Sequence, residues 1–289
     1  MHKIKVNIKK SYLSEAENIL FETVPNNWML SLNRKTKQLF LEGIFENKEE
    51  ANDALLDFQK RFSQKIDDFV VTEIDDDWKE SYKYHFTKWN YKGYSFVPEW
   101  DRNSLDSNAK NNKIYIDPGM AFGTGTHETT RLCIEILIDI YTETSDTKNS
   151  FLDVGCGSGI LSILAYFLGF KKIQGIDNDD DAIKSSKDNS ALNFHESIIT
   201  FTNRNISTFY GDYFDCVVAN IQSDILINNA HNLIRLLNRK GNLVLSGILN
   251  YEVEDVAKVF DKLFATKNLI NNKVITAKGD WCSIKYQML

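Results

Sequence analysis

Residues 1–45 show short hydrophobic patterns that predict strands and one helix. Alternating apolar and polar residues over Ile4–Lys9 predict a strand, and Ser14 followed three residues later by Glu17 is typical of a capping box that starts a helix. The polar run Asn33–Lys37 separates two apolar stretches, which predicts a hairpin. The order up to this point is strand, helix, strand, strand.

The residues that follow complete the pattern. Asn47 precedes a stretch in which apolar residues recur every three or four positions, which predicts a helix with one apolar face. The residues of this face are Ala51, Ala54, Leu55, Phe58 and Phe62. A last strand over Phe69–Ile74 gives the ferredoxin-like order βαββαβ. We therefore expect residues 1–75 to form a small α+β domain of this type, and domains of this kind commonly recognise a partner.

Residues 76–112 show neither the clear alternation that predicts a strand nor the three-to-four-residue recurrence that predicts a helix. Aromatic residues are frequent from Trp78 to Trp100, and residues 101–112 are mostly polar. We expect this stretch to be a linker whose aromatic side chains pack between two domains.

From residue 113 onward, apolar strand-like runs alternate with helical stretches. Such alternation predicts an α/β domain over residues 113–289, with a mostly parallel sheet and helices on both faces. The expected strands are 151–154, 172–176, 198–202, 214–219 and 242–246, and the expected helices are 129–140, 160–168, 180–189 and 224–237. Residues 273–286, with a turn at Lys278–Asp280, predict a C-terminal antiparallel hairpin.

Composition narrows the class of protein. With 43% hydrophobic and 26% charged residues, the chain resembles an ordinary soluble globular protein. Its apolar runs are far shorter than the roughly 20 residues of a membrane span, and its first residues lack the core of a signal peptide. We expect a cytoplasmic protein without membrane attachment. The net charge of −6 argues against direct nucleic-acid binding.

Cysteine spacing excludes two further classes of site. Cys133, Cys156, Cys216 and Cys282 form no C-x-x-C pair, and the sequence has no histidine cluster. This spacing supports neither a disulfide framework nor a zinc site, so we expect buried, reduced thiols and no metal.

A glycine-rich turn after the first expected strand is the main sign of a ligand site. Gly155, Gly157 and Gly159 follow the strand, and Asp177 lies at the end of the next strand, where related folds place an acid for ribose hydroxyls. The spacing G-x-G-x-G differs from the dinucleotide pattern G-x-G-x-x-G, and Asp153 precedes it. A carboxylate beside the turn suits a ligand that carries an ammonium and a sulfonium better than one with phosphates. S-adenosylmethionine fits this description.

Two other segments extend the expected site. Asn220 ends a buried strand with an amide, and the loop Asp117–Thr130 is rich in glycine and threonine and leads into a helix. The start of a helix attracts carboxylates through its free N–H groups and its dipole.

These motifs resemble the PrmA-type methyltransferases of ribosomal protein eleven of the large subunit. The similarity covers residues 113–289 well, and the N-terminal segment is similar in layout only. The segments that carry the similarity are Asp117–Thr130, Asp153–Leu161, Gly175–Asp177, Val218–Ile221, Leu245–Ile248 and Trp281–Cys282. The resemblance implies a monomeric, S-adenosylmethionine-dependent class I enzyme. Its substrate would be that ribosomal protein, methylated on lysine side chains, on its N-terminal amine, or on both.

The resemblance also assigns residues to the cofactor. It implies that Thr130 and Gly155 contact the methionine end and that Asp177 holds the ribose. From the turn itself, we add Asp153 and Gly157 to the expected cofactor-binding set. Thr130 has the alternative role of an ordinary hydroxyl at a helix start.

Three residues are expected at the reacting end of the cofactor. The resemblance implies that Asn220 lies beside the reacting methyl group and that Phe122 and His127 face the cofactor or the incoming amine. The alternatives are a turn-stabilising role for Asn220, a backbone hydrogen bond for His127 and core packing for Phe122. No carboxylate follows Asn220 until Asp224, so we expect no strong general base. Asn220 would accept an N–H bond and orient the amine.

Gln222 is a departure from the family pattern, because a small apolar residue is expected there. This leaves the shape of the acceptor pocket open. One alternative function is methylation of glutamine amides or nucleobase nitrogens, but such enzymes follow the strand-end residue with Pro-Pro and an aromatic residue, and Ile221–Gln222 supplies neither. A second alternative is a non-catalytic nucleotide-binding assembly module.

Overall fold

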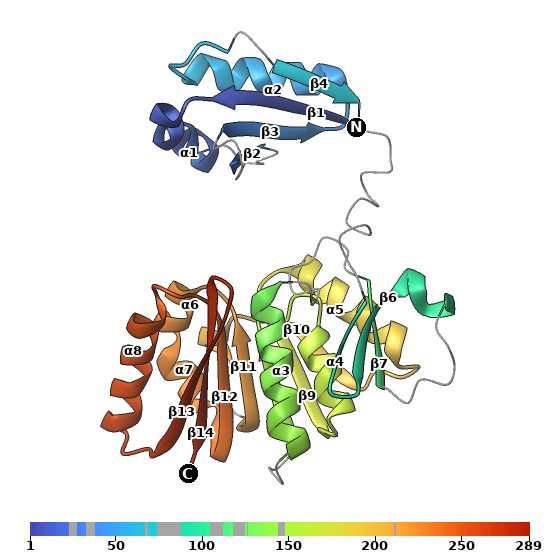
Figure 1. Ribbon diagram of the computed structural model, residues 1–289, viewed down its shortest axis with the longest axis vertical. Helices are drawn as coiled ribbons and strands as arrows, with labels where there is room; N and C mark the ends of the chain where they lie inside the picture. The colour runs from blue at the N-terminus through green and yellow to red at the C-terminus, as the bar shows by residue number, and fades with distance from the viewer. Residues whose placement is uncertain are drawn as a thin grey trace. The chain divides into compact units, whose positions relative to one another are not determined.

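The chain forms two compact units, Met1–Tyr84 and His85–Leu289, which we call the N-terminal and the C-terminal unit. The computed structural model describes residues 1–22, 28–32, 38–66, 69–73, 88–104, 112–117, 125, 127–143, 148–210 and 212–289 (Figure 1). None of the helices in these ranges is long and apolar enough to cross a membrane.

The N-terminal unit has the expected ferredoxin-like fold. Its four strands pair antiparallel in the order β2-β3-β1-β4. The elements are β1 (His2–Ile8), a 3-10 turn (Lys10–Tyr12), α1 (Leu13–Glu22), β2 (Trp28–Leu32), β3 (Leu39–Phe45), α2 (Lys48–Arg61) and β4 (Phe69–Glu73). Ile4, Val6 and Ile8 alternate along β1 and are buried against α1 and α2, whereas Lys5 and Asn7 are exposed on the other face of the sheet.

Local signals explain one helix of this unit better than the other. The Asn47 side chain caps α2 by accepting a hydrogen bond from the Glu50 N–H at 2.8 Å, and the apolar face of α2 is buried as predicted. Ser14 lies inside the first turn of α1, one residue after the helix begins, so the predicted capping box is wrong. The 3-10 turn before α1 starts the helix earlier than the capping pattern suggests. The expected turn Asn33–Lys37 lies outside the described residues.

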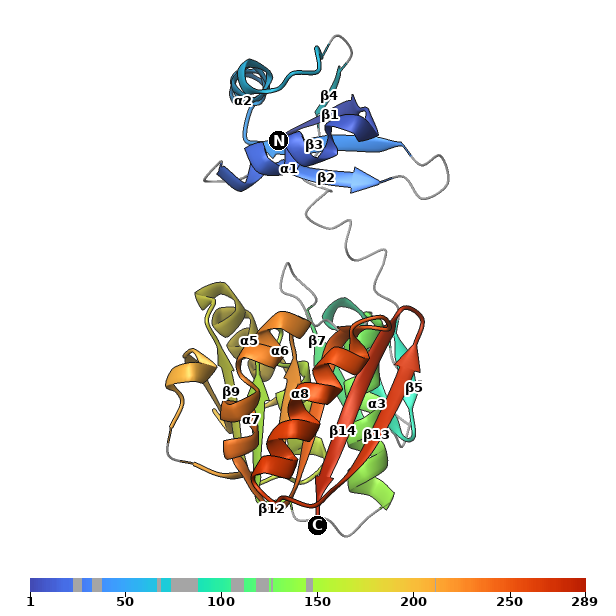
Figure 2. The ribbon, with the colours of Figure 1, turned by 90° about the vertical axis from the view of Figure 1, so that its left-hand side faces the viewer.

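The C-terminal unit is built on a seven-stranded sheet in the order β10-β9-β8-β11-β12-β14-β13 (Figures 1 and 2). The first five strands of this order are parallel to one another, and β14 runs antiparallel to both of its neighbours, which confirms the predicted sheet and C-terminal hairpin. The strands are β8 (Ser150–Val154), β9 (Lys172–Asp177), β10 (Ile199–Asn203), β11 (Phe214–Asn220), β12 (Leu237–Leu249), β13 (Asn271–Lys278) and β14 (Trp281–Met288).

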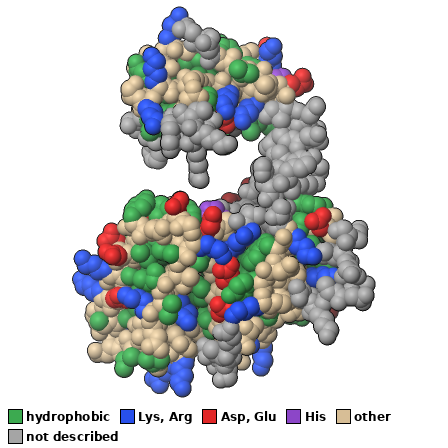
Figure 3. Space-filling model, viewed as in Figure 1, with side chains coloured by type: hydrophobic (Ala, Val, Ile, Leu, Met, Phe, Trp, Pro, Cys, Tyr) green, Lys and Arg blue, Asp and Glu red, His purple; other side chains and the backbone are tan. Residues whose placement is uncertain are grey.

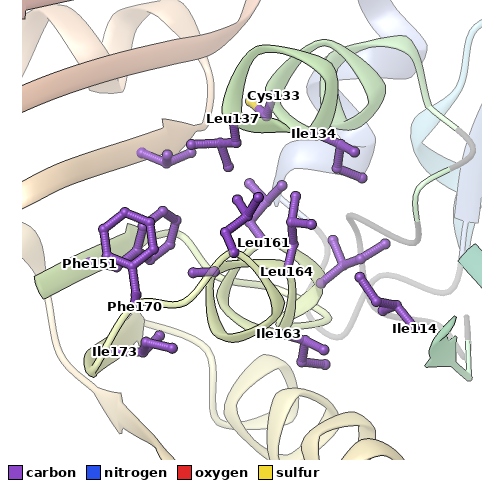
Figure 4. Packing of buried hydrophobic residues seen from close by; sticks show 14 of the residues in the cluster. Ile114, Cys133, Ile134, Leu137, Phe151, Leu161, Ile163, Leu164, Phe170 and Ile173 are labelled. Atoms are coloured by element: carbon purple, nitrogen blue, oxygen red, sulfur yellow. The ribbon is translucent and has the colours of Figure 1, made fainter. Parts of the chain in front are cut away.

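Helices cover both faces of this sheet, and each face has its own hydrophobic core. One core contains side chains of α3 (Glu128–Glu143), α4 (Ile160–Phe167) and α5 (Asp180–Asn193), and Figure 4 shows Phe151 and Leu161 within it. The other core contains side chains of α6 (Ser223–Asn228), α7 (Ala230–Arg235) and α8 (Val253–Thr266). Successive residues of β8, Phe151 and Leu152, point into different cores, so a parallel strand that is buried on both faces reads as a continuous apolar run.

Three features of this unit differ from the sequence prediction. The expected helix 224–237 is two helices, α6 and α7, which meet at Asn229. Helix α8 was missed, although Val256, Phe260 and Phe264 recur at helical spacing and are buried. Residues assigned to the linker form β5 (Trp89–Tyr91), β6 (Tyr94–Pro98) and a 3-10 helix (Glu99–Ser104), and β6 pairs with β7 (Asn112–Ile116).

The four cysteines are buried and unpaired by disulfides, as predicted. Burial raises the pKa of every one of these thiols above its ordinary value, in Cys133 to about 12. They are therefore neutral packing residues at physiological pH.

Candidate functional site

A cavity of about 1080 Å³ opens at the carboxyl ends of the central strands of the C-terminal unit. Residues that follow four neighbouring strands line it: Gly155 after β8, Asp177 at the end of β9, Asn205 after β10 and Asn220 at the end of β11. Strand order reverses between β8 and β11, and open α/β sheets bind ligands at such a switch point. The cavity therefore lies where the fold favours a cofactor.

The glycine turn has a backbone that other residues rarely adopt. Gly155, Gly157 and Gly159 have φ angles of 70°, 51° and 78°. A Cβ at position 155 would also lie 2.4 Å from Cγ2 of Ile221, in the loop after β11. Gly155 is therefore required by this close approach as well as by its left-handed conformation. The turn brings Gly155 and Gly157 into the cavity wall, and their contact with a cofactor stays a prediction.

Asp177 is held in place by backbone donors on both of its oxygens. Gly157 N–H donates to Oδ2 at 3.0 Å, and Asp179 N–H donates to Oδ1 at 3.2 Å. The side chain is half-buried and lines the cavity. Each carboxylate oxygen retains lone-pair capacity for a further donor such as a hydroxyl. The predicted acid is thus fixed and still able to accept hydrogen bonds from a ligand.

Asp153 lies behind the turn and is only 1% exposed. Its Oδ2 accepts hydrogen bonds from Ser162 N–H at 3.1 Å and from Ser162 Oγ at 2.8 Å, which ties β8 to α4. Burial raises the pKa of Asp153 to about 7, although the hydrogen bonds from Ser162 oppose this shift. Asp153 is not among the described residues that line the cavity, so its direct contact with a cofactor stays a prediction.

Thr130 and Asn220, far apart in the sequence, meet beside the cavity. Asn220 Nδ2 donates to Thr130 Oγ1 at 3.3 Å, and Thr130 is fully buried. Asn220 lines the cavity and is 9% exposed. Among the described residues, its Oδ1 has no hydrogen-bond partner. A buried amide oxygen without a donor is costly, so this atom is a candidate acceptor for a substrate N–H.

His127 stands at the start of α3 against the hairpin of β13 and β14. Its Nδ1 lies 2.8 Å from Thr129 Oγ1, and its ring makes an edge contact with Trp281 at 4.9 Å between centroids. His127, Thr129 and Trp281 all line the cavity. Phe122, the other residue expected near the reacting end, lies outside the described residues.

Sequence reasoning missed other parts of the cavity wall. Apolar side chains of Ile176, Ala182 and Ile206 line one part of it, and Trp281 lines another. Trp281 lies at the tip of the C-terminal hairpin, and although the segment Trp281–Cys282 carries part of the family resemblance, no site role was expected of this side chain. The wall also carries more acids than bases. The acids are Asp117, Asp177, Asp179, Asp181 and Asp188, and the bases are Lys184 and Arg204.

Comparisons with known proteins agree on one family. A family model described as "Ribosomal protein L11 methyltransferase (PrmA)" matches residues 4–288. The ribosomal protein L11 methyltransferase of Thermoanaerobacter pseudethanolicus is 34% identical over 75% of this chain and 67% of its own length. The one from Listeria monocytogenes is 38% identical over 75% of this chain and 66% of its own length. The aligned part thus spans about two thirds of these relatives.

A solved structure shares a large part of this fold. The crystal structure of ribosomal protein L11 methylase from Lactobacillus delbrueckii subsp. bulgaricus superposes with a TM-score of 0.60 at 27% identity. It covers 70% of this chain and 99% of that chain.

Proposed function

The chain belongs to the family of ribosomal protein L11 methyltransferases, and we propose that it transfers methyl groups from S-adenosylmethionine to amines of ribosomal protein L11. The acceptors are lysine side chains, the N-terminal amine, or both. The observation that carries this proposal is the buried amide of Asn220, which lines the same cavity as the glycine turn and Asp177 and whose Oδ1 has no hydrogen-bond partner within the described part of the chain. An amine that enters this cavity would supply the missing donor.

The cavity wall suits the three parts of S-adenosylmethionine. Asp177 would accept hydrogen bonds from the ribose hydroxyls, and the apolar side chains of Ile176, Ala182 and Ile206 would pack against the adenine. Gly155 and Gly157 line the cavity, and their backbone would lie beside the methionine end. The excess of carboxylates favours a cofactor that carries positive charges and no phosphate. When bound, the cofactor supplies a methyl group on a sulfonium, a strong electrophile.

The protein's task is to present a neutral, correctly aimed amine. A lysine with a pKa of about 10.4 must lose a proton, which costs roughly 4.6 kcal/mol at pH 7, whereas a chain-terminal amine needs only about 1 kcal/mol. Burial in the cavity lowers the pKa of an amine, as does a nearby positive charge. Asn220 Oδ1 would accept one N–H and so direct the nitrogen lone pair, and Thr130 would hold the Asn220 amide from its other side.

We assign recognition of the ribosomal protein to the N-terminal unit. The described residues that line the cavity all belong to the C-terminal unit, which supports a role for the N-terminal unit outside the chemistry. Its sheet has one face covered by helices and one open face, a suitable surface for docking a folded partner. We keep residues 1–75 as this recognition domain.

The proposal also includes a monomeric enzyme of the cytoplasm that does not bind nucleic acid. The net charge of −6 and the acidic cavity wall support the last of these three points, the absence of nucleic-acid binding. On the face shown in Figure 3, basic and acidic side chains are interspersed and form no basic stripe of the kind that nucleic-acid binders carry.

The direct test is incubation with labelled S-adenosylmethionine and undermethylated ribosomal protein L11, followed by mass spectrometry of the labelled peptides. We expect label on amine nitrogens of that protein and none in ribosomal RNA. Label on glutamine amides or nucleobases would support the alternative methyltransferases. Tight cofactor binding with no methyl transfer to any ribosomal component would support a non-catalytic module.

A further inference from the structure

The loop that carries Asn220 is anchored at its far end by a carboxylate outside the cavity. Glu252 Oε2 accepts a hydrogen bond from Ser223 Oγ at 2.6 Å and another from Leu249 N–H at 3.0 Å. Ser223 starts α6 and is 8% exposed, Leu249 ends β12, and Glu252 stands at the start of α8. One oxygen atom thus joins three elements.

The near end of this loop is fixed by close packing. Ile221 N–H donates to the Ser246 carbonyl at 3.2 Å. A Cβ at Gly155 would lie 2.4 Å from the Ile221 side chain, and a Cβ at Gly247 would lie 2.4 Å from the Ile221 carbonyl oxygen. Ile221 therefore fits between two glycines, and it cannot shift toward either without a clash. The Ser223 end of the loop is instead held through the side-chain hydrogen bond to Glu252.

Helix capping does not account for the Glu252 side chain. Glu252 is the N-cap residue of α8, yet its side chain makes no capping hydrogen bond to that helix. It instead reaches back to β12 and across to α6. Two donors on one ionised oxygen make charge-assisted bonds, which are stronger than those between neutral groups. Glu252 is also absent from the described lining of the cavity, so it is placed to act on the loop and not on a ligand.

We propose that Glu252 is a positioning residue for methyl transfer, because by holding Ser223 it fixes the loop Asn220–Ser223 and with it the direction of the Asn220 amide. This inference rests on the proposed function. Misdirection of an orienting group lowers turnover more than it lowers binding, since orientation matters most in the transition state. The sequence offers no local sign of this role, because Glu252 lies 29 positions beyond Ser223.

The test compares Glu252→Ala, Glu252→Gln and Ser223→Ala in the full-length protein. We expect Glu252→Ala to lower kcat by about tenfold, with KM for ribosomal protein L11 and Kd for S-adenosylmethionine within about twofold. A glutamine side chain at this position would keep an amide oxygen that can accept both hydrogen bonds, so Glu252→Gln should recover most of the lost kcat. The double variant Ser223→Ala with Glu252→Ala should lose no more than Glu252→Ala alone, because Ser223→Ala removes a contact that Glu252→Ala has already removed.

Glu254→Ala is the matched control. Glu254 is an exposed acid in the first turn of α8, so this change removes the same charge from the same helix end without touching Ser223. It should leave kcat unchanged. A folded Glu252→Ala variant with normal kcat, or additive losses in the double variant, would overturn the positioning role.

Hydrogen exchange separates this inference from the proposed function. The Leu226 amide, which donates to the Gln222 carbonyl across Ser223, should exchange about tenfold faster in Glu252→Ala than in the wild-type protein or in Glu254→Ala. If wild-type protein shows no methyl transfer, the proposed function fails, and this measurement still decides whether Glu252 holds the loop. Equal exchange in all three proteins would show that it does not.

Discussion

The two units of this protein bury their sheets in different ways. In the N-terminal unit, β1 alternates buried Ile4 and Val6 with exposed Lys5, because helices cover only one face of the sheet. In the C-terminal unit, all seven residues of β11 are buried, because helices cover both faces. A sheet with an open face can offer a broad docking surface, whereas a covered sheet is reached from outside only at its edges and strand ends. This contrast fits recognition in one unit and chemistry in the other.

The contrast extends to one carboxylate in each unit. Burial raises the pKa of Glu42, but the hydrogen bonds and charges of Lys5 and Lys3, at 2.7 and 3.0 Å, leave it below its usual value. Burial of Asp153 in the C-terminal unit raises its pKa to about 7, and Ser162 only partly opposes the shift. An open face lets lysines reach an acid, and a core covered on both faces does not.

The largest expected effect comes from removing the N-terminal unit. The fragment His85–Leu289 keeps the cavity and should bind S-adenosylmethionine with Kd within about threefold of the full-length protein. Methylation of ribosomal protein L11 should fall by roughly 10²-fold or more, because the substrate is no longer held near the cavity. Isothermal titration and methyl-transfer kinetics measure the two quantities. Full activity of the fragment would refute a recognition role for the N-terminal unit.

The starting point of this fragment matters. A fragment that began near residue 111 would lack β6 and would expose core around β7, since Phe96 and Ile114 are fully buried. Circular dichroism and thermal unfolding should confirm that His85–Leu289 is folded before its activity is compared. A short lysine peptide is the control substrate, and the fragment and the full-length protein should methylate it equally.

Within the C-terminal unit, Asn220→Ala should have the next largest effect. We expect turnover to fall roughly 10²-fold, while cofactor affinity changes little, because the cofactor keeps its other contacts. Raising the pH supplies neutral amine but does not restore its direction, so it should rescue only part of the loss. Complete recovery at high pH would mean that Asn220 promotes deprotonation. Asn228→Ala, at an exposed position of α6, is the control and should leave turnover unchanged.

Asp177→Ala should weaken S-adenosylmethionine binding by about 1.5–3 kcal/mol, the typical cost of losing hydrogen bonds to a charged group. Calorimetric titration measures this change. Asp180→Asn is the control, because Asp180 is an exposed acid at the start of α5 outside the cavity lining. If both variants bind like the wild type, Asp177 has no role at the ribose.

The sequence predicted the elements whose signal is local. The fully buried strands β8 and β11 read as largely apolar runs, and the α2 stripe read as one helical face. Residues 89–98 gave no such signal, because their aromatic residues suit a linker as well as a strand. They are strands because Phe96 and Val97 are buried when β6 pairs with β7, a contact that only the folded chain provides.

The site likewise has residues that the sequence pattern places and contacts that only the folded chain reveals. Gly155, Asp177 and Asn220 follow strands that neighbour one another in a parallel sheet, so strand order alone places them together. The sequence could not show that Asp153 turns away from the cavity toward Ser162, because that direction depends on how α4 packs against β8. Nor could it show that Glu252 reaches Ser223, because no motif spans the two helices.

The last comparison concerns the pH dependence of stability, and not of activity, in the two units. The folded pKa of Asp153, about 7, lies above its unfolded value of about 3.8, so its contribution is fully present below about pH 4 and is lost as pH rises through about 7. Removing this group by Asp153→Asn should remove a slope of at most about 1.4 kcal/mol per pH unit between those limits. The asparagine oxygen can still accept the Ser162 hydrogen bonds. Urea unfolding of the wild type and the variant from pH 4 to pH 8 measures the difference.

Glu42 in the N-terminal unit should contribute to stability with the opposite pH dependence, and Glu42→Gln tests this. The folded pKa of Glu42 lies below its ordinary value, so its contribution is present above about pH 4.5 and is lost as pH falls through the folded pKa. The Glu42→Gln profile should therefore depart from the wild type by a constant amount above about pH 5 and converge with it in acid. The difference in unfolding free energy between Asp153→Asn and the wild type should change between pH 4 and pH 7 and stay constant above about pH 7. If Asp153→Asn runs parallel to the wild type throughout, then Asp153 is ionised in the folded protein over this whole range, and burial on both faces of the sheet does not set its charge.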